Sequence, residues 1–139
     1  MTKLWISGSS GFVGKHLYKY LNKLDKYEIE LVSNSRSNEK NKIYLNYSSE
    51  KQLIDNINAR GAPDVFIHLG WGHVYDPHNE IHLSKNLKEG KKLFKCLFKC
   101  GTKKIIFFGS SSEYGGNLGC LKENLEINEF QNRYVEAKY

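Results

Sequence analysis

A tyrosine and a lysine stand four residues apart in the last segment of the chain, "QNRYVEAKY". On a helix, positions i and i+4 are neighbours, so Tyr134 and Lys138 are expected to lie side by side. A free phenol has a pKa of about 10, and a nearby ammonium lowers it by stabilising the phenolate. The pair could therefore take the proton of a hydroxyl group while a hydride leaves the same carbon. Such pairs are also common on surface helices, so the prediction depends on the rest of the chain.

A glycine-rich loop lies near the start of the chain. The segment "GSSGFVG" places Gly8, Gly11 and Gly14 between an apolar segment and a stretch with helical spacing. Glycine permits a tight turn and lets the backbone approach a pyrophosphate, and a helix N-terminus offers unpaired N–H groups. We therefore predict that this loop binds the phosphates of a nucleotide. The alternative is a tight turn without a ligand.

Short apolar segments alternate with longer amphipathic ones along the whole chain. Strands are expected over 3–7, 28–33, 42–46, 64–70 and 104–109, and helices over 12–24, 49–60, 79–100 and from about 130. This alternation predicts an α/β fold, with a doubly wound parallel sheet covered by helices. The length of 139 residues suggests one domain, and no repeat or linker divides it.

Composition and charge exclude several function classes. The net charge of +6 favours an anionic partner such as a nucleotide, but the lysines are scattered, so we expect no nucleic-acid binding. Without a signal peptide, a span-length apolar run or a CxxC pair, we expect a cytoplasmic protein that does not bind membranes. His78 and His82 are four apart but lack a third ligand, and His68 is expected in the core, so no metal is predicted.

Five motifs in order resemble the extended short-chain dehydrogenase/reductase superfamily, the NAD(P)-dependent nucleotide-sugar epimerases, dehydratases and reductases. They are the G-x-x-G-x-x-G loop, "HLGWG" (68–72), Asn86, "GSSSEYGG" (109–116) and "YVEAK" (134–138). The resemblance implies a Rossmann fold for residues 1–139. It also implies hydride transfer at a carbon of a nucleotide-activated sugar, and a homodimer for the full-length enzyme.

The resemblance also implies roles for single residues. Tyr134 would be the general acid/base, Lys138 would lower its pKa and hold the nicotinamide ribose, and Ser111 would polarise the substrate carbonyl. Ser110 and Ser112 remain alternatives, because the segment before Tyr-Gly is one residue shorter than usual. The implied cofactor-binding residues are Gly8, Ser10, Gly11, Phe12, Val13, Gly14, Asn46, Tyr47, Leu69, Gly70, Trp71, Asn86 and Lys138.

The end of the second expected strand bears on the choice of cofactor. Ser33 stands where an acidic residue would select NAD, and Arg36 follows it. An arginine can pair with a 2′-phosphate through a bidentate fork. We therefore expect NADP(H) to be preferred over NAD(H), the alternative being that Arg36 is a solvated loop residue. Asn46 holds the place where the family often has an aspartate that contacts adenine, and an amide can still bond the adenine edge.

Two questions stay open at this level. Glu113 could assist the expulsion of water, as in some dehydratases of the family, although a glutamate that only supports its neighbours is the favoured interpretation. The C-terminal substrate-binding region of the family does not follow "YVEAK". We expect a fragment of a full enzyme, rather than a natural truncation that binds nucleotide without turnover or a chain completed by another chain. The competing function is a non-catalytic dinucleotide-binding module.

Overall fold

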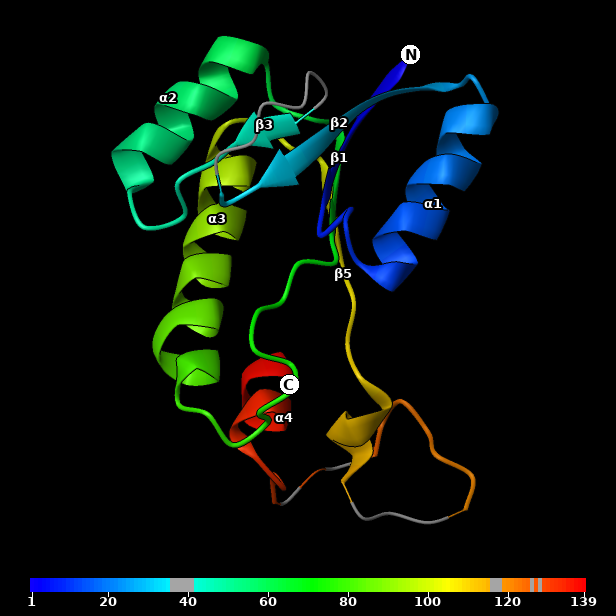
Figure 1. Ribbon diagram of the computed structural model, residues 1–139, viewed down its shortest axis with the longest axis vertical. Coiled ribbons are helices and arrows are strands. Elements are labelled where there is room, and N and C mark those ends of the chain that lie inside the picture. Colours follow the sequence, from blue (N-terminus) through cyan, green and yellow to red (C-terminus); the bar gives the residue numbers. More distant parts are fainter. Residues whose placement is uncertain (36–41, 116–118, 126, 128) are drawn as a thin grey trace. The chain divides into compact units, whose positions relative to one another are not determined.

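The computed structural model describes residues 1–35, 42–115, 119–125, 127 and 129–139. The chain divides into two compact units, one formed by residues 1–70 and 89–108, the other by residues 71–88 and 109–139. The first unit contains the sheet, and the second contains three short helical segments (Figure 1). No helix in these described ranges combines the length and the apolar character that crossing a membrane requires.

The sheet has five parallel strands in the order β3-β2-β1-β4-β5. Their bounds are β1 Thr2–Ser7, β2 Tyr27–Ser33, β3 Lys42–Tyr44, β4 Val65–His68 and β5 Lys104–Phe107. The strand order reverses at β1, which pairs with β2 on one side and β4 on the other, so that Ser7 lies opposite both Val32 and His68. The predicted doubly wound parallel sheet is thus confirmed. In such sheets ligands bind at the carboxyl ends of the strands where the order reverses.

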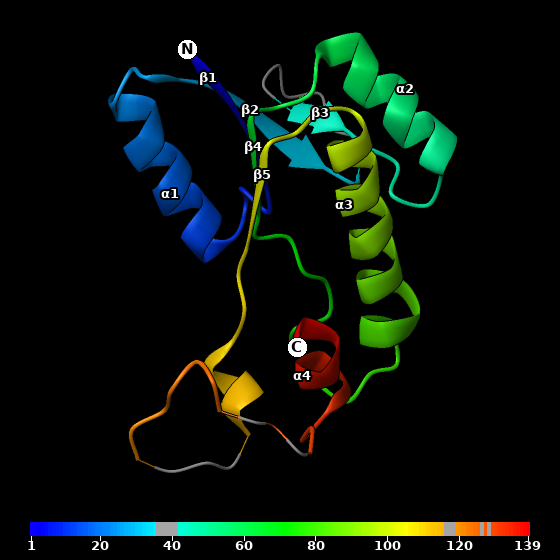
Figure 2. The same cartoon turned by 180° about the vertical axis from the view of Figure 1, so that it is seen from behind.

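Helices cover both faces of the sheet. Helix α1 (Phe12–Lys23) lies on one face, whereas α2 (Glu50–Arg60) and α3 (Lys88–Lys99) lie on the other (Figures 1 and 2). Successive strand residues point to opposite faces. Trp5 and Phe66 therefore pack in the cluster under α2 and α3, and Ile6 and Ile67 in the cluster against α1. Burial on both faces explains the apolar runs LWI (4–6) in β1 and VFI (65–67) in β4.

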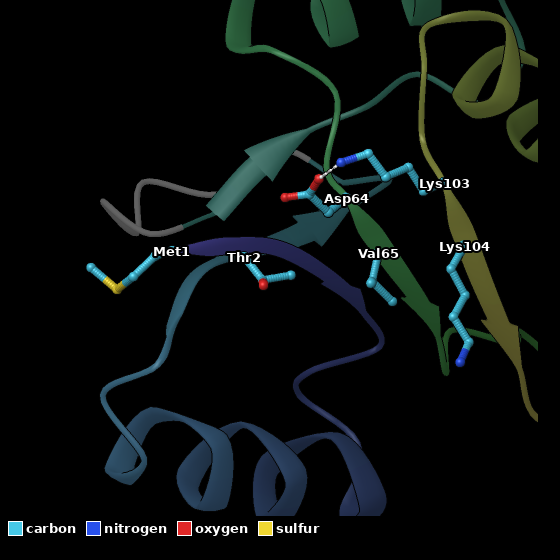
Figure 3. Close-up of a pocket in the computed structure, with 6 residues that line it drawn as sticks. All are labelled: Met1, Thr2, Asp64, Val65, Lys103 and Lys104. Atoms are coloured by element: carbon cyan, nitrogen blue, oxygen red, sulfur yellow. Dashed lines mark hydrogen bonds and ion pairs between the residues drawn. The ribbon is translucent and has the colours of Figure 1, made fainter.

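A hollow at the amino ends of β1, β4 and β5 is lined by Met1, Thr2, Asp64, Val65, Lys103 and Lys104 (Figure 3). The Asp64 carboxylate accepts a hydrogen bond from Lys103 Nζ at 2.7 Å and another from the Lys3 backbone N–H at 2.9 Å. These bonds hold the pKa of Asp64 below its ordinary value. Asp64 thereby ties the start of β1 to the approach to β5, at the opposite end of the strands from the glycine loop.

The second unit contains a π-helical turn η1 (His82–Leu87), a 3₁₀ turn η2 (Ser111–Tyr114) and helix α4 (Arg133–Lys138). The helix predicted over 79–100 is present, and residues 82–87 of it are π-helical. Asn132 caps α4 by accepting from the Val135 N–H at 3.0 Å. The Tyr134 N–H donates to the Pro77 carbonyl at 2.8 Å, which fixes α4 against the segment before η1.

Candidate active site

The glycine loop has the geometry that its sequence predicts. Gly8 has φ +73°, a conformation that side chains other than glycine rarely adopt. A Cβ atom on Gly8 would lie 2.5 Å from the backbone nitrogen of Gly70, and one on Gly14 would lie 2.2 Å from the Gly8 carbonyl oxygen. The Gly11 N–H closes the turn on the Gly8 carbonyl at 3.1 Å. The glycines therefore let β1, the turn and α1 approach one another as closely as they do.

The N-terminus of α1 is open to an anion. Its N-cap is Gly11, which makes no side-chain cap, and its first turn carries no acidic residue. Ser10, Gly11, Phe12 and Val13 are all exposed. Within the described residues, no N-cap side chain accepts from the first N–H groups of α1, and the helix dipole favours negative charge there. These residues fit a pyrophosphate group.

The segment after β4 is fastened beside this loop. The Ser7 hydroxyl lies 2.7 Å from His68 Nδ1, and the Gly70 N–H donates to Ser7 Oγ at 3.4 Å. The Leu69 N–H donates to the Ser7 carbonyl at 3.2 Å. The expectation that His68 is a buried, hydrogen-bonded core residue is confirmed. Leu69 and Gly70 therefore stand next to Gly8 at the reversal of the strand order.

The polar side chains Ser33 and Asn46, at the ends of β2 and β3, make hydrogen bonds with nearby residues. Ser33 accepts a hydrogen bond from the Ser35 N–H at 3.1 Å, and Arg36 lies outside the described residues. Both polar atoms of Asn46 are engaged: Oδ1 accepts from the Ser48 N–H at 3.1 Å, and Nδ2 donates to Gln52 at 2.8 Å. A contact with adenine would require exchange of one of these exposed bonds.

Tyr47 follows Asn46 and packs against the core cluster under α2 and α3. Burial raises the pKa of its phenol above the ordinary value, and the charge of Glu89 raises it further. Tyr47 is thus held neutral, as a packing residue whose hydroxyl keeps its proton.

In the second unit, α4 brings Tyr134 and Lys138 together on one face. The Lys138 ammonium lies 5.9 Å from the centroid of the Tyr134 ring and 4.5 Å from that of the Trp71 indole. The Trp71 and Tyr134 rings meet almost at right angles, with centroids 6.3 Å apart. Trp71 is therefore a third member of this group, and it offers its ring face to the ammonium.

The electrostatics of the pair are set by burial and one carboxylate. Burial lowers the pKa of the Lys138 ammonium, and the negative charge of Glu113 partly opposes this effect. The half-buried Lys138 ammonium is thus held beside the Tyr134 ring.

The turn η2 assigns different tasks to its neighbouring polar residues. Ser110 caps the turn by accepting from the Ser112 N–H at 3.3 Å, and Glu113 accepts from the Ser110 N–H at 2.6 Å, which completes a capping box. Ser111 and Ser112 are exposed. Ser110 is thus occupied by the cap, and Glu113 has a structural task whether or not it has a chemical one.

Asn86 and a residue that the sequence did not single out complete the group around Trp71. Asn86, on η1, donates to the Gly72 carbonyl at 2.9 Å. His82, at the start of η1, is fully buried and accepts a hydrogen bond from the Trp71 indole N–H at 3.1 Å. The sequence showed this histidine only as a weak metal candidate paired with His78. Among the described residues, no three His, Cys, Asp or Glu side chains form a group that could hold a metal ion.

Comparison with known proteins gives consistent results. The sequence model of the NAD-dependent epimerase/dehydratase family matches residues 4–139. An uncharacterized protein of Methanocaldococcus jannaschii, MJ1055, is 31% identical over a 135-residue alignment, which covers 81% of this chain and 40% of that relative.

Solved structures of about twice this length share the fold. UDP-glucose 4-epimerase from Brucella ovis, in complex with NAD, superposes with a TM-score of 0.80 at 18% identity, covering 99% of this chain and 45% of that one. UDP-N-acetylglucosamine 4-epimerase from Bacillus cereus superposes with a TM-score of 0.79 at 18% identity, covering 99% of this chain and 47% of that one. UDP-glucose 4-epimerase from Bifidobacterium longum, in complex with NAD and UDP, superposes with a TM-score of 0.76 at 24% identity, covering 99% of this chain and 46% of that one. The chain thus spans less than half of these relatives, and the likeness confirms the Rossmann-type fold.

Proposed function

Since this chain belongs to the NAD-dependent epimerase/dehydratase family, we propose that it is the cofactor-binding part of an enzyme that transfers a hydride at a carbon of a nucleotide-activated sugar. The names of the similar solved structures support the substrate class, because they are UDP-sugar epimerases, some of them with NAD bound. We also propose that the full-length protein is a homodimer. In each subunit, the C-terminal region of the longer chain would supply most contacts to the sugar.

The observation that carries this proposal is the pairing of Tyr134 with Lys138 on α4. When bound, a nicotinamide cofactor supplies the group that accepts or returns the hydride. Tyr134, as phenolate, takes the proton of the sugar hydroxyl as the carbon is oxidised, and gives it back on reduction. Lys138 stabilises that phenolate, and the exposed Ser111 hydroxyl donates a hydrogen bond to the sugar oxygen.

Cofactor binding is proposed to rest mainly on backbone groups. The uncapped N–H groups at the start of α1 bind the pyrophosphate. Leu69, Gly70, Trp71 and Asn86 line the nicotinamide half, and Asn46 and Tyr47 the adenine half. At the ribose, Arg36 favours the 2′-phosphate of NADP, and Ser33 presents no carboxylate that would repel it.

The test of the proposal uses the longest protein that contains this sequence. NAD(H) and NADP(H) are titrated, and turnover is followed with a series of UDP-sugars through product analysis. Replacement of Tyr134 by Phe keeps the ring but removes the hydroxyl, so kcat is expected to fall by about 10²–10⁴-fold while cofactor binding persists. Tyr75→Phe is the matched control, because Tyr75 is 98% exposed.

Three results would contradict parts of the proposal. Unchanged turnover in Tyr134→Phe would remove the assigned acid/base. Cofactor binding without reaction on any sugar would favour a non-catalytic dinucleotide-binding module. Equal or tighter binding of NAD(H) than of NADP(H) would defeat the role given to Arg36.

A further inference from the structure

His82 is fully buried, and its two ring nitrogens make hydrogen bonds of opposite sense. The indole N–H of Trp71 can only donate, so His82 Nδ1 accepts that bond at 3.1 Å. The backbone carbonyl of Asp76 can only accept, so His82 Nε2 donates to it at 2.9 Å. The two partners together require a neutral imidazole with its proton on Nε2.

Asn86 supports the same assignment. Its amide Nδ2 lies 3.4 Å from His82 Nδ1 and can only donate there, while it donates to the Gly72 carbonyl at 2.9 Å. His82 and Asn86 both belong to the π-helical turn η1. Such turns are rare and are frequent at functional sites. The turn presents both side chains to the segment that carries Trp71.

The rings of Trp71, His82 and Tyr134 restrain one another. The Trp71 and His82 rings are nearly parallel, at 13°, and are joined edge to edge by their hydrogen bond. Tyr134 stands at 86° to Trp71 and at 74° to His82, with centroid distances of 6.3 and 5.4 Å. The hydrogen bond fixes the plane of the indole, and the Tyr134 ring limits its rotation.

The plane of the indole in turn decides where the Lys138 ammonium can rest. That ammonium lies 4.5 Å from the indole centroid, over the negative face of the ring. The same helix α4 is held to the segment around η1 by the Tyr134 N–H on Pro77 and by Arg133 on Glu80, at 2.7 Å. Rotation of the Trp71 indole would remove its contact with the Lys138 ammonium, while α4 would stay held by the two hydrogen bonds.

We infer that His82 is a positioning residue for the Tyr134–Lys138 pair. Acting as a hydrogen-bond acceptor, it orients Trp71, and Trp71 holds the ammonium of Lys138 beside the phenol of Tyr134. The catalytic consequence of this inference rests on the proposed function, but the arrangement itself does not.

The arrangement is tested by NMR on the 139-residue chain. Nitrogen shifts of the histidine side chains are expected to show His82 neutral at pH 7, with the proton on Nε2. The Lys138 methylene next to the ammonium is expected upfield, because that ammonium lies over the indole ring, and Trp71→Leu identifies that shift. An Nδ1–H tautomer, a charged imidazole, or Lys138 signals unchanged by Trp71→Leu would overturn the inference.

A variant series then separates hydrogen bonding from packing. His82→Phe keeps a buried ring but removes the acceptor, so the upfield shift of Lys138 is expected to disappear. His82→Asn retains an acceptor near the position of Nδ1 and is expected to restore part of the shift. His78→Phe is the matched control, since His78 lies four residues earlier and is exposed. If His82→Phe does not fold, the tautomer of His82 measured in the unmodified chain still decides whether His82 accepts the bond from Trp71.

Kinetics of the longest protein that contains this chain test the consequence. His82→Phe is expected to lower kcat about 10- to 100-fold, as small misplacements of catalytic groups do. His82→Asn is expected to recover much of the loss, which a purely structural role would not predict. If Tyr134→Phe loses turnover but His82→Phe does not, the inference fails and the proposed function stands. If Tyr134→Phe keeps turnover, the proposed function fails, and the NMR result alone decides the positioning of Lys138.

Discussion

The two units of this chain present candidate ligand-binding groups of different kinds. In the first unit, the candidate groups are backbone N–H groups at the start of α1, which the glycine turn and the sheet hold in place. In the second unit, they are the side chains of Tyr134 and Lys138 on a helix of only six residues. The backbone N–H groups at the start of α1 are therefore available because the glycines carry no side chain. The positions of Tyr134 and Lys138 depend instead on contacts with neighbouring side chains.

The comparison has an energetic counterpart. The first unit buries large apolar side chains such as Trp5, Phe66 and Leu97 on both faces of the sheet. The second unit places an ammonium where burial lowers its pKa, which is a cost to folding. Functional side chains are expected to be less stable in their positions than the scaffold, since sites often sacrifice stability for activity.

The largest expected effect is that of a side chain in the glycine turn. A Cβ on Gly14 would lie 2.2 Å from the Gly8 carbonyl oxygen, so Gly14→Val should destabilise the protein by about 3 kcal/mol or more. Cofactor binding should be lost with it. The control is Gly90→Ala in α3, where nothing lies within 4 Å of the new Cβ and stability should rise by about 0.5–1 kcal/mol. Denaturant unfolding compares them, and a stable Gly14→Val protein that binds cofactor would refute the backbone account.

Next in size is the loss of the Lys138 charge. Lys138→Met should reduce kcat of the longer protein by about 10²-fold or more, because the phenolate of Tyr134 loses its stabilising cation. The free energy of unfolding should stay level or rise, since a half-buried charge is replaced by an apolar side chain of similar length. Unfolding and turnover are measured on the same preparation. A marked fall in stability would show that the ammonium is structural.

A smaller effect is expected at Glu113. Glu113→Ala removes the acceptor for the Ser110 N–H and should cost about 1 kcal/mol, as the loss of other helix caps does. Glu113→Gln keeps a carbonyl oxygen in that place and should restore stability. If turnover also returns in Glu113→Gln, the residue acts only as a cap. If stability returns but turnover does not, the carboxylate itself takes part in the reaction, as the dehydratase hypothesis requires.

The same contrast explains what the sequence could predict. The alternation of strands and helices along the chain, the glycine turn and the covered parallel sheet follow from local patterns, because apolar periodicity and glycine spacing can be recognised in consecutive residues. The i,i+4 spacing was likewise enough to place Tyr134 near Lys138. The family match confirms the resemblance that these motifs indicated.

What the sequence could not predict depends on contacts between distant segments. The helix predicted over 79–100 contains the π-helical turn η1, which the apolar periodicity does not reveal. One feature of the candidate site depends on it: the hydrogen bond from Trp71 to His82, eleven residues away. Phe12 and Val13 are apolar, yet both are exposed at the start of α1.

The smallest effect tests whether the far end of the sheet has only a structural part. Asp64, at the amino ends of the strands, has its pKa lowered by the bond from Lys103 and by that from the Lys3 N–H. A carboxyl group whose pKa is lower in the folded state contributes stability above its ordinary pKa of about 3.9 and loses that contribution as pH falls below it. Asp64→Asn should therefore unfold at slightly lower temperature at pH 7, and the difference from the unmodified chain should vanish in acid. Because Lys103 is exposed, high salt should also reduce the difference.

Cofactor affinity at pH 7 should not change, since Asp64 lies at the opposite end of the strands from the glycine turn. A weaker affinity in Asp64→Asn would mean that the two ends of the sheet are coupled, and the backbone site would then depend on side chains as the Tyr134–Lys138 pair does.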